Sequence, residues 1–100
     1  MEGQASISND VLSRYAADAA REVEGVRKLV GSSLPRHRSV RATERDGGMA
    51  VELHLGLAWR ASAPAVGRAV QERVGDYLAH MASARPTSVD VIFDEIGPPA

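Results

Sequence analysis

The stretch SVRATERDGGMAVELHLGLAWR, residues 39–60, decides the fold. Its second half alternates apolar residues with polar or small ones at a period of two, which is the pattern of a β-strand with one buried face. The apolar positions are Val51, Leu53, Leu55, Leu57 and Trp59, and the alternate positions are Glu52, His54, Gly56, Ala58 and Arg60. This pattern predicts a core strand.

An Asp-Gly pair at residues 46–47 predicts a two-residue turn that joins this strand to a shorter one before it. Such a turn pairs Arg41 with Glu52 on one face and Val40 with Leu53 on the other. A slip by one residue would place Arg41 among apolar side chains. The two faces therefore predict the register of the hairpin.

A first amphipathic helix is expected from about Asn9 to Glu24, with Ser8 as its N-cap and Gly25 as a left-handed stop. Apolar residues recur at three- and four-residue spacing and form one stripe. They are Val11, Leu12, Tyr15, Ala16, Ala19, Ala20 and Val23.

A second helix is expected within SAPAVGRAVQERVGDYLAHM, residues 62–81, with Pro64 near its first turn. Its apolar stripe comprises Val66, Val70, Val74, Tyr77, Leu78 and Met81. Gly67 and Gly75 each cost about 1 kcal/mol against alanine in a helix interior. Close packing and simple tolerance are both open as explanations.

Residues 87–96 alternate again and predict a last strand, whereas residues 31–38 read as a loop and residues 97–100 as a tail. The expected fold class is α+β, in one domain over residues 1–100 with a core from about 7 to 96. We expect a two-layer sandwich in which two helices cover one face of a small mixed or antiparallel sheet. The other face would carry Arg41, Glu52, His54, Asp90 and Asp94.

Composition limits the possible functions. The 100 residues include 12 Lys and Arg against 13 Asp and Glu, and no cysteine, so disulfides, thiolate metal ligands and a cysteine nucleophile are excluded. The N-terminal residues have no signal-peptide pattern, and no apolar run reaches the length of a membrane span. We expect a cytoplasmic domain without direct membrane insertion.

Candidate catalytic, cofactor-binding and metal-binding constellations are absent from the sequence. His37, His54 and His80 have no metal-ligand spacing. His54 could meet Asp90 or Asp94 across the sheet and act as a general base, but a solvated charge pair is the favoured interpretation. We therefore predict no enzyme activity and no cofactor.

A basic segment at residues 36–45 supports an alternative function as a nucleic-acid or anionic-ligand binding module. It contains Arg36, His37, Arg38, Arg41 and Arg45. Against nucleic acid, all the aromatic residues fall on predicted core stripes and leave no surface for base stacking. They are Tyr15, Trp59, Tyr77 and Phe93.

Several motifs together resemble the bacterial alkaline shock protein family, the Gls-type envelope stress response proteins. They are I-S-x-x-V-L at residues 7–12, A-A-x-E-V-E-G-V at 19–26, V-Q-E-x-V at 70–74 and the closing V-x-V at 89–91. The resemblance implies a non-enzymatic cytoplasmic protein that self-associates and is sometimes held at the membrane by a membrane-embedded protein partner.

Self-association is also suggested by the polar side of the sheet, where Gly56 and Ala58 are small and Ile92 is apolar. With both helices needed on the opposite side, nothing in the chain is left to cover this surface. The candidate interaction residues are Arg36, His37, Arg38, Arg41, Ala58 and Ile92.

Overall fold

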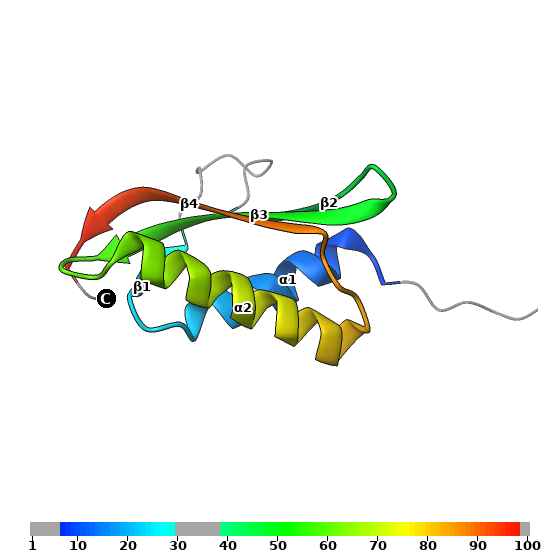
Figure 1. Cartoon of the computed structure of the whole chain (residues 1–100), viewed down its shortest axis with the longest axis horizontal. Coiled ribbons are helices and arrows are strands. Elements are labelled where there is room, and N and C mark those ends of the chain that lie inside the picture. The colour runs from blue at the N-terminus through cyan, green and yellow to red at the C-terminus, as the bar shows by residue number, and fades with distance from the viewer. Residues whose placement is uncertain (1–6, 30–38, 99–100) are drawn as a thin grey trace, which may run out of the picture.

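The computed structural model describes residues 7–29 and 39–98 and has two layers, a sheet and a pair of helices on one side of it (Figure 1). The predicted α+β sandwich is confirmed. In chain order the elements are α1 Asn9–Arg21, β1 Val26–Leu29, β2 Val40–Arg45, β3 Gly48–Ala58, α2 Ala63–Ala82 and β4 Ser88–Gly97.

The sheet is mixed and is built around β3. One edge of β3 pairs antiparallel with both β2 and β1, which follow one another along it, and the other edge pairs parallel with β4. β3 is therefore hydrogen-bonded on both sides, whereas β4 has an open outer edge among the described residues.

The predicted hairpin register is confirmed, with Val40 opposite Leu53 and Arg41 opposite Glu52. Asp46 and Gly47 have φ values of 52° and 80°. Positive φ at both central residues matches the right-handed twist of the paired strands, which explains why an Asp-Gly pair fixes this turn.

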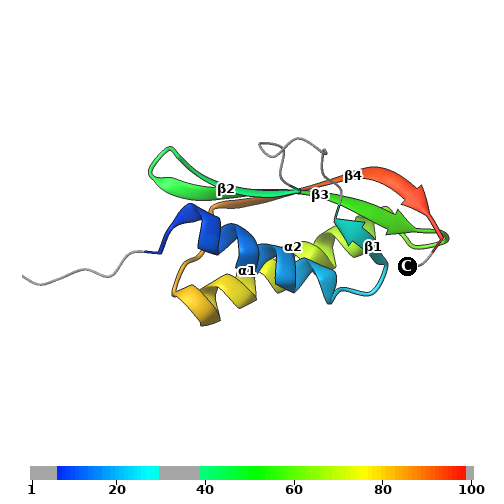
Figure 2. The same cartoon turned by 180° about the vertical axis from the view of Figure 1, so that it is seen from behind.

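α1 lies beneath β2 (Figure 2) and ends at Arg21 rather than Glu24. Most of the predicted stripe is buried, but Val11 and Tyr15 are half-buried. The N–H of Glu22 closes the last turn of the helix. Gly25 has the expected positive φ, +98°, but it lies in the turn before β1 rather than directly after the helix, so its assignment as the helix stop is wrong. Ser13 is buried although it lies outside the predicted stripe. Its hydroxyl oxygen accepts a hydrogen bond from the backbone N–H of Ala42 on β2 at 3.0 Å. The helix thus supplies a partner for a backbone N–H that points away from β3.

α2 packs on the sheet through Val66, Val70, Val74 and Leu78, which are buried as predicted. Met81 is 45% exposed, so its assignment to the core is wrong. It lies in the last turn of the helix, beyond the buried stripe. Among the described residues, neither helix combines the length and the apolar character needed to cross a membrane.

Strand β1 was not predicted. Its sequence VRKL lacks period-two alternation because a β-bulge interrupts the pairing between Val26 and Lys28. The extra residue, Arg27, shifts the face on which the following side chains lie. A pattern search at a fixed period cannot detect such a strand.

Two expectations at the far end of the sheet are also wrong. Trp59 was expected in the core but is 60% exposed, because β3 ends at Ala58 and the chain turns away through Arg60, whose φ is +71°. Gly97 was expected in the tail but closes β4, where its carbonyl accepts from the N–H of Trp59 at 2.8 Å.

Leu55→Asp tests the face assignment of β3. Leu55 is 0% exposed, and the carboxylate would be buried without a partner, so we expect the free energy of unfolding to fall by at least about 3 kcal/mol in urea melts. Ala65→Asp, at an exposed position in the first turn of α2, is the control and should cost little. A loss below about 1 kcal/mol for Leu55→Asp would contradict the assignment.

Candidate functional site

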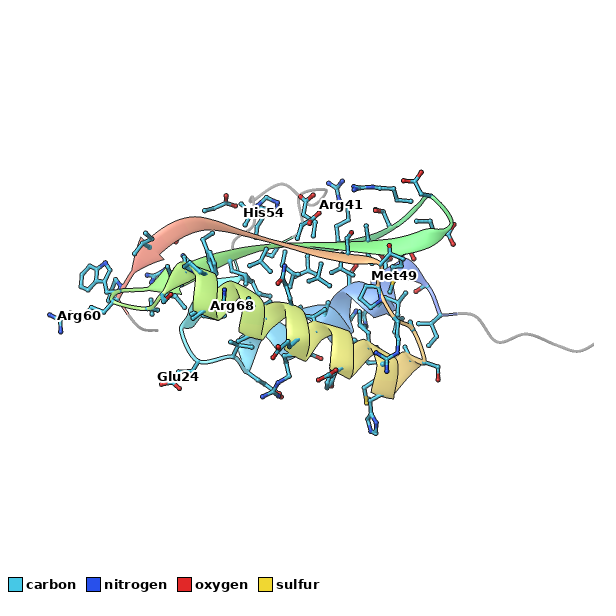
Figure 3. All side chains as sticks on the ribbon, in the orientation of Figure 1. Glu24, Arg41, Met49, His54, Arg60 and Arg68 are labelled. Carbon is cyan, nitrogen blue, oxygen red and sulfur yellow. The ribbon has the colours of Figure 1, made fainter. Side chains whose placement is uncertain are left out.

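The sheet surface turned away from both helices is the candidate site, called the open face below. Side chains of Arg41 and His54 project from the sheet on this side, opposite α2 (Figure 3). The register places the open-face residues on all four strands. They are Lys28 of β1, Arg41 of β2, Glu52, His54, Gly56 and Ala58 of β3, and Asp90, Ile92, Asp94 and Glu95 of β4.

His54 lies between two carboxylates at the centre of the open face. Its Nε2 is 2.7 Å from Oε2 of Glu52, two residues away on the same side of β3. Its Nδ1 is 2.6 Å from Oδ2 of Asp94 on β4. A β-bulge makes this second contact possible, because Phe93 pairs with Leu55 and Glu95 with the next residue, Gly56, leaving Asp94 as the extra residue.

This geometry requires the charged form of His54. A neutral imidazole has one N–H and could donate to only one carboxylate, whereas the imidazolium donates to both. The hydrogen bonds to Glu52 and then Asp94 raise the pKa of His54 above its ordinary 6.5, against a smaller opposing effect of burial. The sequence suggested Asp94 as a partner but did not suggest Glu52.

A second ionic cluster connects the two edges of the sheet. Arg27 and Lys28 of β1 reach across β3 to the carboxylate of Glu95 on β4, at 3.2 and 3.3 Å. The guanidinium of Arg27 also donates to the carbonyl of Pro98 at 2.8 Å. A Cβ at Gly97 would lie 2.7 Å from Nε of Arg27, so a side chain there would make the arginine shift from this position.

The second cluster was missed in the sequence because β1 itself was missed. Gly56 gave a partial signal, since a glycine inside a strand often marks a close approach. A Cβ at Gly56 would lie 3.4 Å from Cγ of Lys28 and 3.5 Å from Cβ of Arg27. Such a Cβ would be in ordinary van der Waals contact with both basic side chains, which pass close to this position.

The predicted interaction residues are only partly covered by the structure. Arg36, His37 and Arg38 lie outside the described residues. Arg41 is exposed beside Glu52, and Ile92 is half-buried beside His54. The remaining one, Ala58, is half-buried at the end of β3.

The arrangement is suited to charge pairing rather than to proton transfer with a substrate. Both ring nitrogens of His54 already face carboxylates, so neither is free to act as a base. Within residues 7–29 and 39–98, no group of three or more His, Asp or Glu side chains is placed to hold a metal ion. The described open face is an ionic surface with apolar positions beside it.

We predict that the contribution of His54 to stability depends on pH. Because its pKa is raised on folding, the contribution should be fully present below pH 6.5 and disappear as the pH rises through the raised pKa of the folded state. Urea melts should show that His54→Gln lowers the free energy of unfolding more at about pH 6 than at about pH 9. An NMR titration that gives His54 a pKa at or below 6.5 would contradict the geometry.

Three solved structures of the MamM CTD are similar to this chain, and they share its fold. A variant with one aspartate changed to asparagine is 19% identical with a TM-score of 0.64, covering 86% of this chain and 90% of that one. A variant with an aspartate and a histidine changed to alanine is 18% identical with a TM-score of 0.61, covering 86% of this chain and 92% of that one. The cadmium form of an aspartate-to-glutamate variant is 17% identical with a TM-score of 0.57, covering 88% of this chain and 98% of that one.

A search of curated proteins gives no match. A family model does match, over residues 1–97, and its description is alkaline shock protein 23 family, cell envelope-related function. The match covers nearly the whole chain and confirms the resemblance carried by the sequence motifs. The chain therefore belongs to the alkaline shock protein 23 family, a family of cell envelope-related function.

Proposed function

We propose that this chain is a non-enzymatic assembly module of the bacterial cell-envelope stress response. It self-associates through the open face of its sheet and acts in the cytoplasm, where a membrane-linked protein partner holds it at the envelope. Family membership supports the envelope connection. The cytoplasmic location and the membrane-linked partner rest on the resemblance to Gls-type proteins.

One observation carries the self-association. Both helices lie on the same side of the sheet, and among the described elements none covers the open face (Figures 1 and 2). This face combines half-buried Ile92 and Ala58 with charged groups of both signs. A surface with apolar positions flanked by paired charges suits contact with another protein better than contact with water alone.

The absence of enzyme activity is part of the proposal. His54 was the candidate base in the sequence, and its two nitrogens are occupied by Glu52 and Asp94. Such a cluster fixes charge on the surface and joins β3 to β4. We assign it a structural and recognition role.

The alternative of nucleic-acid or anionic-ligand binding through residues 36–45 is less well supported. The described open face carries Glu52, Asp90 and Asp94 near Arg41, and these carboxylates oppose a phosphate backbone. All the aromatic residues were expected in the core, which argued against nucleic-acid binding. Trp59 is exposed, however, so its ring is available for base stacking.

Ala58→Arg combined with Ile92→Lys should weaken self-association and leave the monomer folded, because both side chains lie on the open face. Sedimentation over a range of protein concentrations measures the effect. The control is Ala65→Arg with Ile7→Lys, the same chemical changes at exposed positions outside the sheet. Equal assembly of the Ala58 and Ile92 variant, or a monomer at every concentration for the unchanged chain, would reject the interface.

Nucleic-acid binding is tested with mixed single- and double-stranded probes at low and physiological salt. We expect no appreciable binding at physiological salt. Affinity that falls steeply with salt and disappears when Arg36, Arg38 and Arg41 are all changed to glutamine would support the alternative instead.

A further inference from the structure

The outer edge of β4 presents backbone groups that have no neighbouring strand in the described part of the chain. Successive residues of a strand direct their N–H and C=O groups to opposite edges. The N–H of His54 donates to Ser39 at 2.8 Å, so even-numbered residues of β3 face β2. The N–H of Trp59, just after β3, donates to Gly97 of β4 at 2.8 Å, so odd-numbered residues face β4.

This pattern determines which residues of β4 face outward. In the parallel register each odd-numbered residue of β3 bonds to the two residues that flank its neighbour on β4. Val89, Val91 and Phe93 are those neighbours, so their own backbone groups point away from the sheet. The carbonyl of Val89 confirms the direction, because it accepts from the side-chain amide of Gln71 on α2 at 2.9 Å.

Val91 and Phe93 therefore form a short open edge. In Figure 1 no helix or strand lies in front of β4 at this edge. No hydrogen bond from another described element reaches the outward backbone groups of these two residues. Unpaired edge groups of this kind are templates for an added strand.

The charge along β4 selects the occupant. The strand SVDVIFDEIG contains three acidic residues and no basic one. Asp94 and Glu95 have partners on β3 and β1, but Asp90 forms no ion pair with another described residue. Open-face positions along the edge therefore run acidic, apolar, acidic at Asp90, Ile92 and Asp94.

A second copy of this chain fits the edge poorly. Two β4 strands side by side would bring like charges together. The outer edge of β2 carries arginines, but α1 covers it at Ala42, whose N–H is bonded to Ser13. These two facts favour a segment of a different protein.

We propose that the β4 edge binds an extended segment of a partner protein as an added strand. Every second side chain of that segment lies on the open-face side. In order, these side chains are basic beside Asp90, apolar beside Ile92 and basic beside Asp94. The edge site adjoins the open face and shares Ile92 with the contact proposed for self-association. It differs from that contact in using the outward backbone groups of β4, and it does not depend on self-association.

α2 leaves space on the other side of the added strand. Gly67, Gln71 and Gly75 are spaced four residues apart and so share one stripe, and Gln71 faces the β4 edge. A Cβ at Gly67 would meet only Phe93, at 3.9 Å, and one at Gly75 would meet nothing within 4 Å. Close packing within the described chain thus does not explain either glycine. The space suits the alternate side chains of an added strand that point toward α2.

The probe is the synthetic peptide Thr-Lys-Val-Ile-Val-Lys-Thr, whose pattern reads the same in both directions and so suits a parallel or antiparallel strand. We expect it to shift the NMR signals of the amides of Val91 and Phe93 and to slow their hydrogen exchange. The same peptide with glutamate in place of both lysines should bind much more weakly. Proline in place of the isoleucine and both valines should abolish binding, because it removes the backbone donors to the edge in either strand direction.

Two variants of the full chain complete the test. Val91→Pro removes an outward N–H without breaking the bonds to β3 and should weaken binding about tenfold or more. Asp90→Lys changes an exposed side chain and leaves one basic and one acidic position along the edge. It should therefore remove the preference, so that the lysine and glutamate peptides bind about equally. This second variant keeps the test decisive if Val91→Pro fails to fold.

Absence of binding by the lysine peptide, or binding that neither variant changes, would overturn the proposal. Concentration-dependent protection of the Val91 and Phe93 amides in the chain alone would assign the edge to a second copy and would also overturn it. Sedimentation of Val91→Pro separates this outcome from assembly through the open face, because the variant should lose assembly through the edge and keep assembly through the face.

Discussion

The structure depends on the pairing of β3 with strands along both of its edges. Its apolar side chains are fully buried at Val51, Leu53 and Leu55, and both helices pack on that side. A chain of this length has enough helix to cover one face of the sheet. The same arrangement that builds the core therefore leaves the opposite face without a covering layer among the helices and strands that the structure describes.

The features that could be predicted from the sequence are those with regular spacing. The hairpin register follows from alternation and the Asp-Gly turn, and the helices follow from apolar stripes, with Ser8 capping α1 as expected. On the open face, the contact between His54 and Asp94 was among the pairings considered. These predictions succeeded because local pattern and tertiary packing agree at these positions.

The features that could not be predicted arise where a strand departs from its period or extends beyond the helices. The bulge at Arg27 conceals β1, and the bulge at Asp94 brings that carboxylate to His54. Trp59 continues the apolar alternation of β3 but lies after its last residue, where it is exposed. Alternation predicts the face on which a side chain lies, but it does not predict whether another element covers that face.

The central claim is that the open face mediates self-association, and methyl NMR of isoleucine tests it most directly. The chain has three isoleucines, Ile7, Ile92 and Ile96, and they report on different surfaces. Ile7 precedes α1 and Ile96 is exposed at the far end of β4, whereas Ile92 lies beside His54. As protein concentration rises, the Ile92 methyl signal should shift or broaden while the signals of Ile7 and Ile96 change little. A response confined to Ile7 or Ile96, or an unchanged Ile92 signal in a sample that assembles, would contradict the account.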